Sequence, residues 1–213
     1  MRGRLTFITA VLAFALVAPA ATASSSPVLP YNSSPYGHSY RTWFRMVGQF
    51  YLGDSSNPLI AALSGECGQM IDGAFFMAAP IDVGIELDCS VPAGTPIVLS
   101  HAAQFATKGI DGQTDRELVD AAKAGFTTSA DELTLDGAAL PLKTIGTGAY
   151  NVISETGSFY DAIIGVGTGP IRTAVVGNVV VLHPLTPGDH DIHGAVSFVS
   201  GAEYSATYDV HVG

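Results

Sequence analysis

Short runs of alternating apolar and polar residues, separated by turns, are the feature that most constrains this chain. In residues 83–88 the apolar Val83, Ile85 and Leu87 alternate with small or acidic residues, as a strand with one solvated face does. Further short runs follow, and Gly/Pro turns such as Pro92-Ala93-Gly94 separate them. The pattern predicts a mainly β fold, an antiparallel β-sandwich or jelly-roll-like single domain with one or two short helices.

One helix is expected after Ser39, a residue type that favours a helix N-cap. Tyr40, Trp43, Phe44 and Val47 follow at the i, i+3, i+4, i+7 spacing of one helical face. This spacing favours an aromatic stripe that packs into the core. A sugar-stacking platform is the alternative reading of the same four side chains.

A second short helix and two tight turns are also expected. Thr114 and Glu117 have the spacing of a capping box, which would open a helix that Gly125 ends. Asp136-Gly137 is a hairpin signal, and Gly177-Asn178 between two valine-rich runs is another candidate for a two-residue turn.

The N-terminus has the pattern of a secretory signal peptide over residues 1–23. Arg2 and Arg4 precede an apolar run over residues 5–17, and Ala21-Thr22-Ala23 has the small-x-small pattern of a cleavage site. An uncleaved anchor is the alternative, although the run is shorter than the roughly 20 residues of a membrane span. Residues 24–37 are rich in Ser and Pro and are expected to be a flexible leader before one β-rich domain at 38–213.

Charge excludes one class of partner. The 213-residue chain has 9 basic and 19 acidic residues and a pI near 4.7. Loss of residues 1–23 removes two arginines and no acid, so the net charge falls from −10 to −12. A nucleic-acid partner is therefore not expected, because phosphate binding requires basic surface. No later apolar run has the length of a membrane helix, so no transmembrane segment is expected after removal of the signal.

Cys67 and Cys89 are the only cysteines, and they are too far apart for a C-x-x-C metal or redox pair. In an exported protein the expectation is a structural disulfide between them. Two free buried thiols are the alternative.

Several segments resemble a group of uncharacterised bacterial secreted β-rich proteins. The similar segments are residues 40–50, Asn57-Pro58-Leu59 followed by Cys67, the C-x-VPAG segment at 89–94, Leu135-Asp136-Gly137, and the PLxPGxHxI segment at 184–192. The resemblance implies a secreted β-rich domain and assigns no catalytic residue.

Histidines and aspartates on the last two strands are the candidates for a chemical site. If the apolar faces of both strands point inward, a three-residue loop at 200–202 sets His193 opposite Asp209 and Asp191 opposite His211. His/Asp pairs suit acid–base chemistry and are ligands for a divalent metal. The alternative is that these pairs only stabilise a solvated sheet face.

Two functions follow from these observations. The first is an exported non-catalytic protein that binds an extracellular or cell-surface ligand or has a structural role, and this reading predicts no cofactor. The second is a small secreted hydrolase or metalloenzyme that uses the His/Asp cluster. The first is preferred because no G-x-S-x-G, H-E-x-x-H or Walker motif occurs in the sequence.

Overall fold

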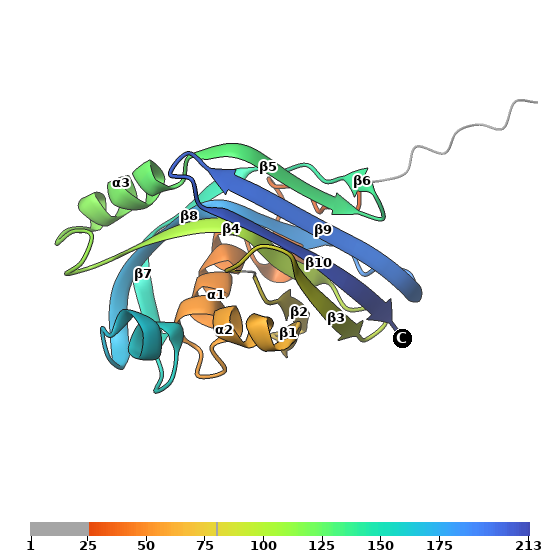
Figure 1. The fold of residues 1–213 in the computed structure, drawn as a ribbon, viewed down its shortest axis with the longest axis horizontal. Coiled ribbons are helices and arrows are strands. Elements are labelled where there is room, and N and C mark those ends of the chain that lie inside the picture. Colours follow the sequence, from red (N-terminus) through yellow and green to blue (C-terminus); the bar gives the residue numbers. More distant parts are fainter. Residues whose placement is uncertain (1–25, 80) are drawn as a thin grey trace, which may run out of the picture.

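The computed structural model describes residues 26–79 and 81–213, which form two packed β-sheets and a few helices (Figure 1). The expected signal peptide lies outside the described residues. Sheet A has the order β1 (Gly68–Ile71), β2 (Ala74–Met77), β4 (Ile97–Thr107), β8 (Gly169–Leu182) and β7 (Thr144–Ser154). Sheet B has the order β3 (Ile85–Val91), β10 (Glu203–Val212), β9 (Gly188–Phe198), β5 (Thr128–Leu135) and β6 (Ala138–Ala139).

This architecture confirms the predicted β-sandwich. The pairings of the described strands are antiparallel except for β2 with β4 and β3 with β10, which are parallel. These two parallel pairs arise because the connections after β2 and β3 cross between the sheets instead of turning back as hairpins.

Both predicted helices are present. In α1 (Tyr40–Gly53) the side chain of Ser39 accepts a hydrogen bond from the N–H of Thr42. In α3 (Asp115–Gly125) the capping box between Thr114 and Glu117 is complete. The described residues also contain four shorter helical segments. Three lie before β1, namely η1 (Pro35–Gly37), α2 (Pro58–Ala61) and η2 (Ala62–Ser64), and η3 (Phe159–Ile164) lies between β7 and β8.

Sheet A is the middle layer of three, because sheet B covers one of its faces and α1 covers the other (Figure 1). Along β8, Val180 and Leu182 pack toward sheet B, whereas Val179 and Val181 pack toward α1. The aromatic stripe of α1 is buried in this second core, which confirms the packing role and leaves its rings inaccessible to a sugar.

Of the two predicted turns, Asp136-Gly137 is confirmed and Gly177-Asn178 is wrong. Asp136 and Gly137 have φ values of 50° and 74°, as a two-residue hairpin between β5 and β6 requires. Residues 177–178 instead lie inside β8, whose apolar run is continuous because the strand is buried on both faces. Gly177 occurs there because a Cβ would lie 2.3 Å from the carbonyl oxygen of Ala102 on the neighbouring strand.

The leader is attached to sheet A from residue 27 onward, which differs from the flexible segment expected at 24–37. The carbonyl of Pro27 accepts a hydrogen bond from His183, and Leu29 donates one to Val181. Val28 is 5% exposed and forms a bridge with Leu182. The segment around Val28 is short, and the Ser/Pro-rich composition of its surroundings gave no strand pattern. Val28 packs into the core at the end of β8.

The disulfide between Cys67 and Cys89 is present and confirms the predicted pairing. It joins the start of the β1 segment to β3, so it links the two sheets covalently. The Cα atoms are 5.3 Å apart, and the sequence separation is 22 residues.

Replacing both cysteines by alanine is expected to lower the free energy of unfolding by about 3 kcal/mol, because the disulfide restricts the unfolded chain. Urea denaturation of the double variant measures the loss. Wild-type protein reduced with dithiothreitol is the control and should have the same urea midpoint as the double variant. An unchanged midpoint in both samples would contradict a stabilising role for the bond.

Candidate functional site

Strands β9 and β10 pair two residues away from the predicted register. His193, predicted to face Asp209, lies opposite Thr207, and a 3.2 Å hydrogen bond joins its Nδ1 to Thr207 Oγ1. The loop is residues 199–201 instead of 200–202, since Phe198 donates to the carbonyl of Ala202. Gly201 has a φ of 90°, and a three-residue hairpin places a left-handed residue last, which fixes this register.

His211 consequently lies opposite Asp189 and not opposite Asp191. Its Nδ1 is 2.7 Å from Asp189, and its Nε2 is 3.3 Å from Asp88 on the adjacent strand β3. Asp191 faces Asp209 directly, so two like charges oppose each other across the sheet. The hydrogen bond to Asp189, with further attraction from nearby carboxylates, raises the pKa of His211 above its usual value.

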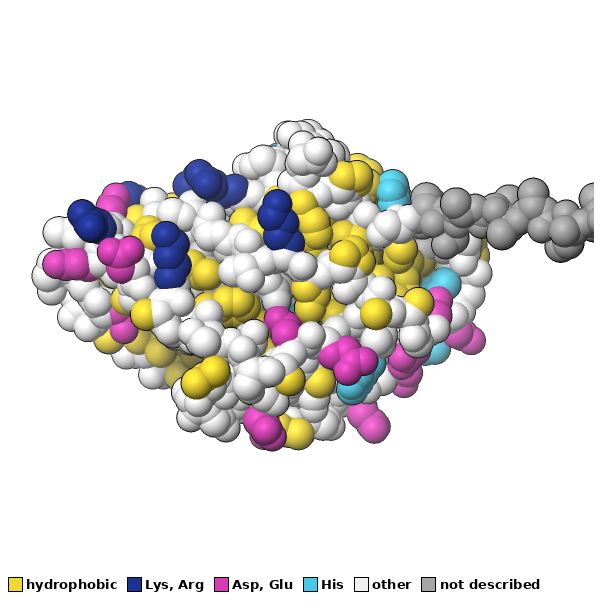
Figure 2. Space-filling view, turned by 90° about the horizontal axis from the view of Figure 1, so that it is seen from above, with side chains coloured by type: hydrophobic (Ala, Val, Ile, Leu, Met, Phe, Trp, Pro, Cys, Tyr) yellow, Lys and Arg dark blue, Asp and Glu magenta, His cyan; other side chains and the backbone are white. Residues whose placement is uncertain are grey.

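The four candidates, His193, Asp209, His211 and Asp191, therefore spread over the outward face of sheet B. Within residues 26–79 and 81–213, no group of three or more His, Cys, Asp or Glu side chains is arranged to hold a metal ion. Figure 2 shows Lys and Arg side chains toward the end of the molecule that carries α3, whereas histidines and many carboxylates lie toward the other end. His211 and its partner Asp189 border an open pocket at this end of the sheet, whereas His193, Asp191 and Asp209 are not part of its lining.

His190 lies outside this surface and has its own partners. Its Nδ1 is 2.9 Å from Asp136 Oδ2, and its Nε2 is 2.9 Å from the carbonyl oxygen of Thr186. The hydrogen bond to Asp136 raises the pKa of His190. These contacts hold the β5–β6 turn against the start of β9, which is a structural role.

A buried polar cluster between the two sheets is the feature that sequence reasoning missed. His101 of β4 is 5% exposed, and its Nε2 is 2.8 Å from Asp131 Oδ1 on β5 of the opposite sheet. The other carboxylate oxygen of Asp131 accepts a short hydrogen bond from the side-chain amide of Asn178. Asn178 also accepts, at its backbone carbonyl, a 3.1 Å hydrogen bond from the Ser100 hydroxyl.

A β-bulge in β4 places His101 in this position. The pairing of β4 with β8 shifts by one residue between Leu99 and Ala102. The extra residue lets both His101 and Ala102 face sheet B, where a regular strand would turn one of them away. On β9, Gly194 provides space for the ring, because a Cβ there would lie 2.6 Å from His101 Nδ1.

A cavity of about 370 Å³ lies beside this cluster. Its walls come from α1, α2, β4, the loop after β2, η3, β8 and the β9–β10 hairpin. The described lining residues are Phe44, Val47, Gly48, Tyr51, Leu52, Leu59, Ala79, Ile81, Ser100, His101, Ala102, Ala103, Gln104, Phe105, Phe159, Val175, Phe198, Ser200, Ala202 and Tyr204. Most of these residues are apolar, and no Lys, Arg, Asp or Glu is among them.

One signal for this site was visible in the sequence. Ser100-His101 interrupts the apolar run over residues 97–106, and a polar pair inside a buried strand requires hydrogen-bonding partners. The partners Asp131 and Asn178 are 30 and 77 residues further along the chain. Only the packing of sheet B on sheet A identifies them.

Comparisons with known proteins give partial structural likenesses and no family. No family model matches the sequence, and no curated protein matches it. InlP of Listeria monocytogenes is similar over 63% of this chain, with 13% identity and a TM-score of 0.26, and the match spans 28% of InlP. Amebosin (9% identity, TM-score 0.22) and PbICP-C, solved in complex with falcipain-2 (10% identity, TM-score 0.23), are similar over 62% and 68% of this chain. The matches cover 98% and 95% of those chains, and TM-scores this low assign no function.

Helix length and hydropathy give one further finding. Among the helices that the structure describes, none has both the length and the apolar character needed to cross a membrane. The disulfide is compatible with an extracellular protein.

Replacing Asp189 by Asn is expected to lower the pKa of His211, because the variant removes the carboxylate that holds its Nδ1. An NMR pH titration of the histidine ring protons measures this change. Because the folded-state pKa lies above an unfolded value near 6.5, the stabilisation from this contact is fully present below about pH 6.5. It is lost as the pH rises through the folded-state pKa.

Asp136→Asn is the matched control for this titration. It should lower the pKa of His190, whose Nδ1 it holds, and leave that of His211 unchanged. A His211 titration that is identical in wild type and Asp189→Asn would contradict the assignment.

Replacing Asp131 by Ala is expected to lower the free energy of unfolding by about 2–4 kcal/mol, because it leaves the buried His101 and Asn178 side chains unpaired. Asp191→Ala on the outward face should change it by less than about 0.5 kcal/mol, since it removes an exposed like-charge contact with Asp209. Urea denaturation measures both. Equal losses in the two variants would refute a supporting role for the buried cluster.

Proposed function

We propose that this protein is an exported binding protein whose ligand occupies the cavity beside β4. The observation that carries the proposal is the cavity itself, a 370 Å³ space with mostly apolar walls. Concave, apolar sites of this size with a few polar groups are the usual form of ligand sites. Binding outside the cytoplasm agrees with the signal-peptide pattern at residues 1–23 and with the disulfide.

The lining defines the chemical class of the ligand. Phe105 and Phe159 provide apolar surface, whereas His101, Gln104 and Ser200 are among the few polar side chains. Without carboxylate, ammonium or guanidinium groups among the described lining residues, a charged ligand would lose its hydration and gain no ion pair. The ligand is therefore uncharged, with apolar groups for the walls and hydrogen-bonding groups for the polar lining.

The buried cluster gives this cavity a rigid wall. Asp131 fixes the ring of His101 through Nε2, and Asn178 holds the same carboxylate from β8. A binding site needs lining side chains whose rotamers are fixed by a second layer of contacts. His101 is thus a polar group held in one position in an apolar wall. Because its side chain is already ordered in the folded protein, ligand binding loses no further conformational entropy at this residue.

The hairpin residues give less support to the alternative of a hydrolase or metalloenzyme. His193 and His211 have separate partners, Thr207 and Asp189, and of these two histidines only His211 borders the open pocket at the end of sheet B. A catalytic site needs its acid, base and reacting atom within hydrogen-bond reach of one another. The cavity beside β4 is more enclosed than the pocket at His211.

Binding of N-phenyl-1-naphthylamine, an uncharged apolar fluorophore, tests the proposal. We expect a rise in its fluorescence that saturates at one molecule per protein. Ile81→Trp, in the loop that lines the cavity, should weaken this binding at least tenfold because the indole ring fills the space. Fluorescence titration measures both affinities.

Ala195→Trp on the outward face of β9 is the control and should bind the fluorophore as wild type does. Ala103→Phe, which fills the cavity from β4, is a second filling variant. Thermal unfolding confirms that each variant is folded. Binding that is absent in wild type, or unchanged in both filling variants, would refute the proposal.

A further inference from the structure

We infer that the ligand of this cavity is an extended, uncharged peptide segment of a partner protein, which adds to sheet A as a strand along the open edge of β4. The inference rests on the proposed function and specifies its ligand. Strand addition to an exposed sheet edge is a general mode of peptide recognition, in which backbone hydrogen bonds contribute affinity.

The cavity lies at the edge of β4 and not over one of its faces. Six consecutive residues, 100–105, line it. Successive side chains of a strand point to opposite faces, so both sets border the same space only where that space runs along the strand edge. The neighbouring strand β2 pairs with β4 only at Ile97 and Val98, which leaves this edge without a partner strand beyond them.

Backbone groups of β4 are directed into this space. Lys108 donates its N–H to Arg172 of the β8 strand, and the pairing is regular from Ala102 to Thr107. Hydrogen bonding alternates along an antiparallel strand, so Ala103 and Phe105 direct their N–H and C=O groups away from β8. Outside the β4–β8 ladder, the hydrogen bonds of the described residues include none from these two N–H groups and none to the Ala103 carbonyl.

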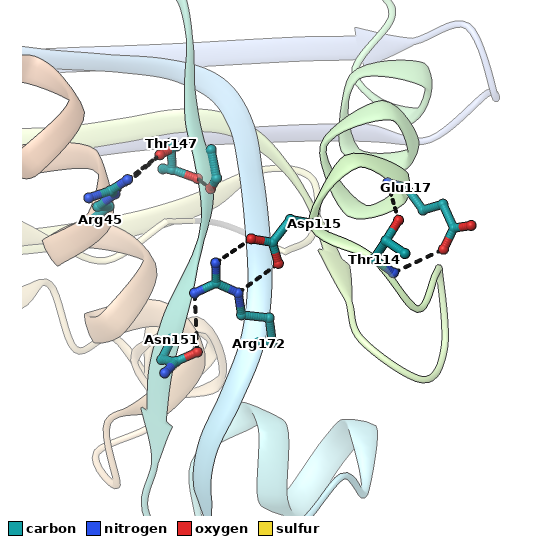
Figure 3. A network of polar contacts seen from close by, with 8 residues as sticks. Arg45, Thr114, Asp115, Glu117, Thr147, Asn151 and Arg172 are labelled. Carbon is teal, nitrogen blue, oxygen red and sulfur yellow. Dashed lines mark hydrogen bonds and ion pairs between the residues drawn. The ribbon is translucent and has the colours of Figure 1, made fainter.

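The opposite edge of sheet A shows how this chain closes an edge that is not used. Arg45 of α1 donates two hydrogen bonds, of 3.1 and 2.8 Å, to the carbonyl of Thr147 on β7 (Figure 3). The side-chain amide of Gln49 both donates to the carbonyl of Ile153 and accepts from its N–H, each at 2.8 Å. Helix α1 therefore replaces a neighbouring strand at β7, whereas its side facing the β4 edge is apolar.

Along residues 100–105 of the described chain, two side-chain contacts reach the backbone of the β4 edge. Gln104 donates to the carbonyl of Phe105, and the Tyr51 hydroxyl is 3.4 Å from the carbonyl of Ser100. These contacts leave the donors of Ala103 and Phe105 unused. Their N–H groups are two residues apart, about 6.7 Å along the strand, which is the repeat of a paired strand.

The residues on the two sides of the cavity determine which side chains the added strand can have. Phe105 and Phe159, which pack against the α1 core, border one side, and Ser200, Ala202 and Tyr204 at the end of the β9–β10 hairpin border the other. Alternate residues of the peptide would point to these walls. Apolar residues fit the α1 side, and small polar ones such as Thr fit the hairpin side.

The blocked peptide acetyl-Thr-Val-Thr-Val-Thr-amide is the probe for this inference. When it is added at millimolar concentration to wild-type protein, hydrogen–deuterium exchange at the amides of Ala103 and Phe105 should slow at least tenfold, as NMR measures. Exchange at Lys108, which is already bonded to Arg172, should stay unchanged. The same peptide with N-methylated valines cannot donate from those positions and should give no protection.

A matched pair of variants tests the role of the backbone donor. Ala103→Pro removes the N–H that faces the cavity and keeps the β8 pairing, because that N–H does not point toward β8. Valine has a volume similar to that of proline, and Ala103→Val keeps the backbone N–H donor. We expect Ala103→Pro to weaken peptide binding at least tenfold relative to Ala103→Val. Thermal unfolding checks that both variants are folded.

Three outcomes overturn the inference. The first is no amide protection by the peptide, and the second is equal protection by its N-methylated form. The third is equal peptide affinity in the folded Pro and Val variants. If wild-type protein still binds N-phenyl-1-naphthylamine in any of these cases, the proposed function stands and the ligand is of another kind. Loss of fluorophore binding in wild type would instead refute the proposed function.

Discussion

The pairing of β4 with β8 is the constraint on which the rest of the structure depends. Both strands lie in the middle of sheet A, and their apolar side chains pack toward sheet B on one face and toward α1 on the other. Backbone groups of a strand need hydrogen-bond partners in the sheet or from side chains wherever the strand is covered and water does not reach it. This requirement explains why α1 donates side-chain hydrogen bonds to β7 and why the leader pairs with the end of β8.

One extra residue in β4 introduces a polar side chain beside the central β4–β8 pair. The bulge between Leu99 and Ala102 turns His101 toward sheet B, where it needs a partner in a dry environment. Asp131 provides that partner from the other sheet, and Asn178 from β8 completes the carboxylate contacts. The same irregular stretch begins where β2 stops pairing, so the polar cluster and the open edge occur together.

The two surfaces that contain histidine differ in their physical character. On the outward face of sheet B, carboxylates and imidazoles are solvated and pair across neighbouring strands, so each contact contributes little and no centre forms. Beside β4, one imidazole is held between apolar walls by a buried carboxylate. Enclosure and lack of competing water make the second location suited to recognition, although it contains fewer charged groups.

Local signals in the sequence predicted local structure well. The caps at Ser39 and Thr114, the Asp136-Gly137 turn, the β-sandwich class and the cysteine pair all follow from spacing within a few residues or from composition. The register of the β9–β10 hairpin depends on the left-handed conformation of Gly201, which the prediction did not take into account. The predicted partners of His193 and His211 are therefore two positions away from the observed ones. The valine-rich run around Gly177 appeared to be two strands because a sequence does not show which faces a strand buries.

The sequence by itself determined the class of fold, the helices and the disulfide, because each depends on nearby residues or on composition. Only the tertiary structure decided where the site lies. His101, Asp131 and Asn178 belong to three strands, and the cavity is bounded by α1, β4 and the last hairpin. Contacts between residues far apart in the chain are set by how two sheets and a helix share one core, and no local pattern encodes that packing.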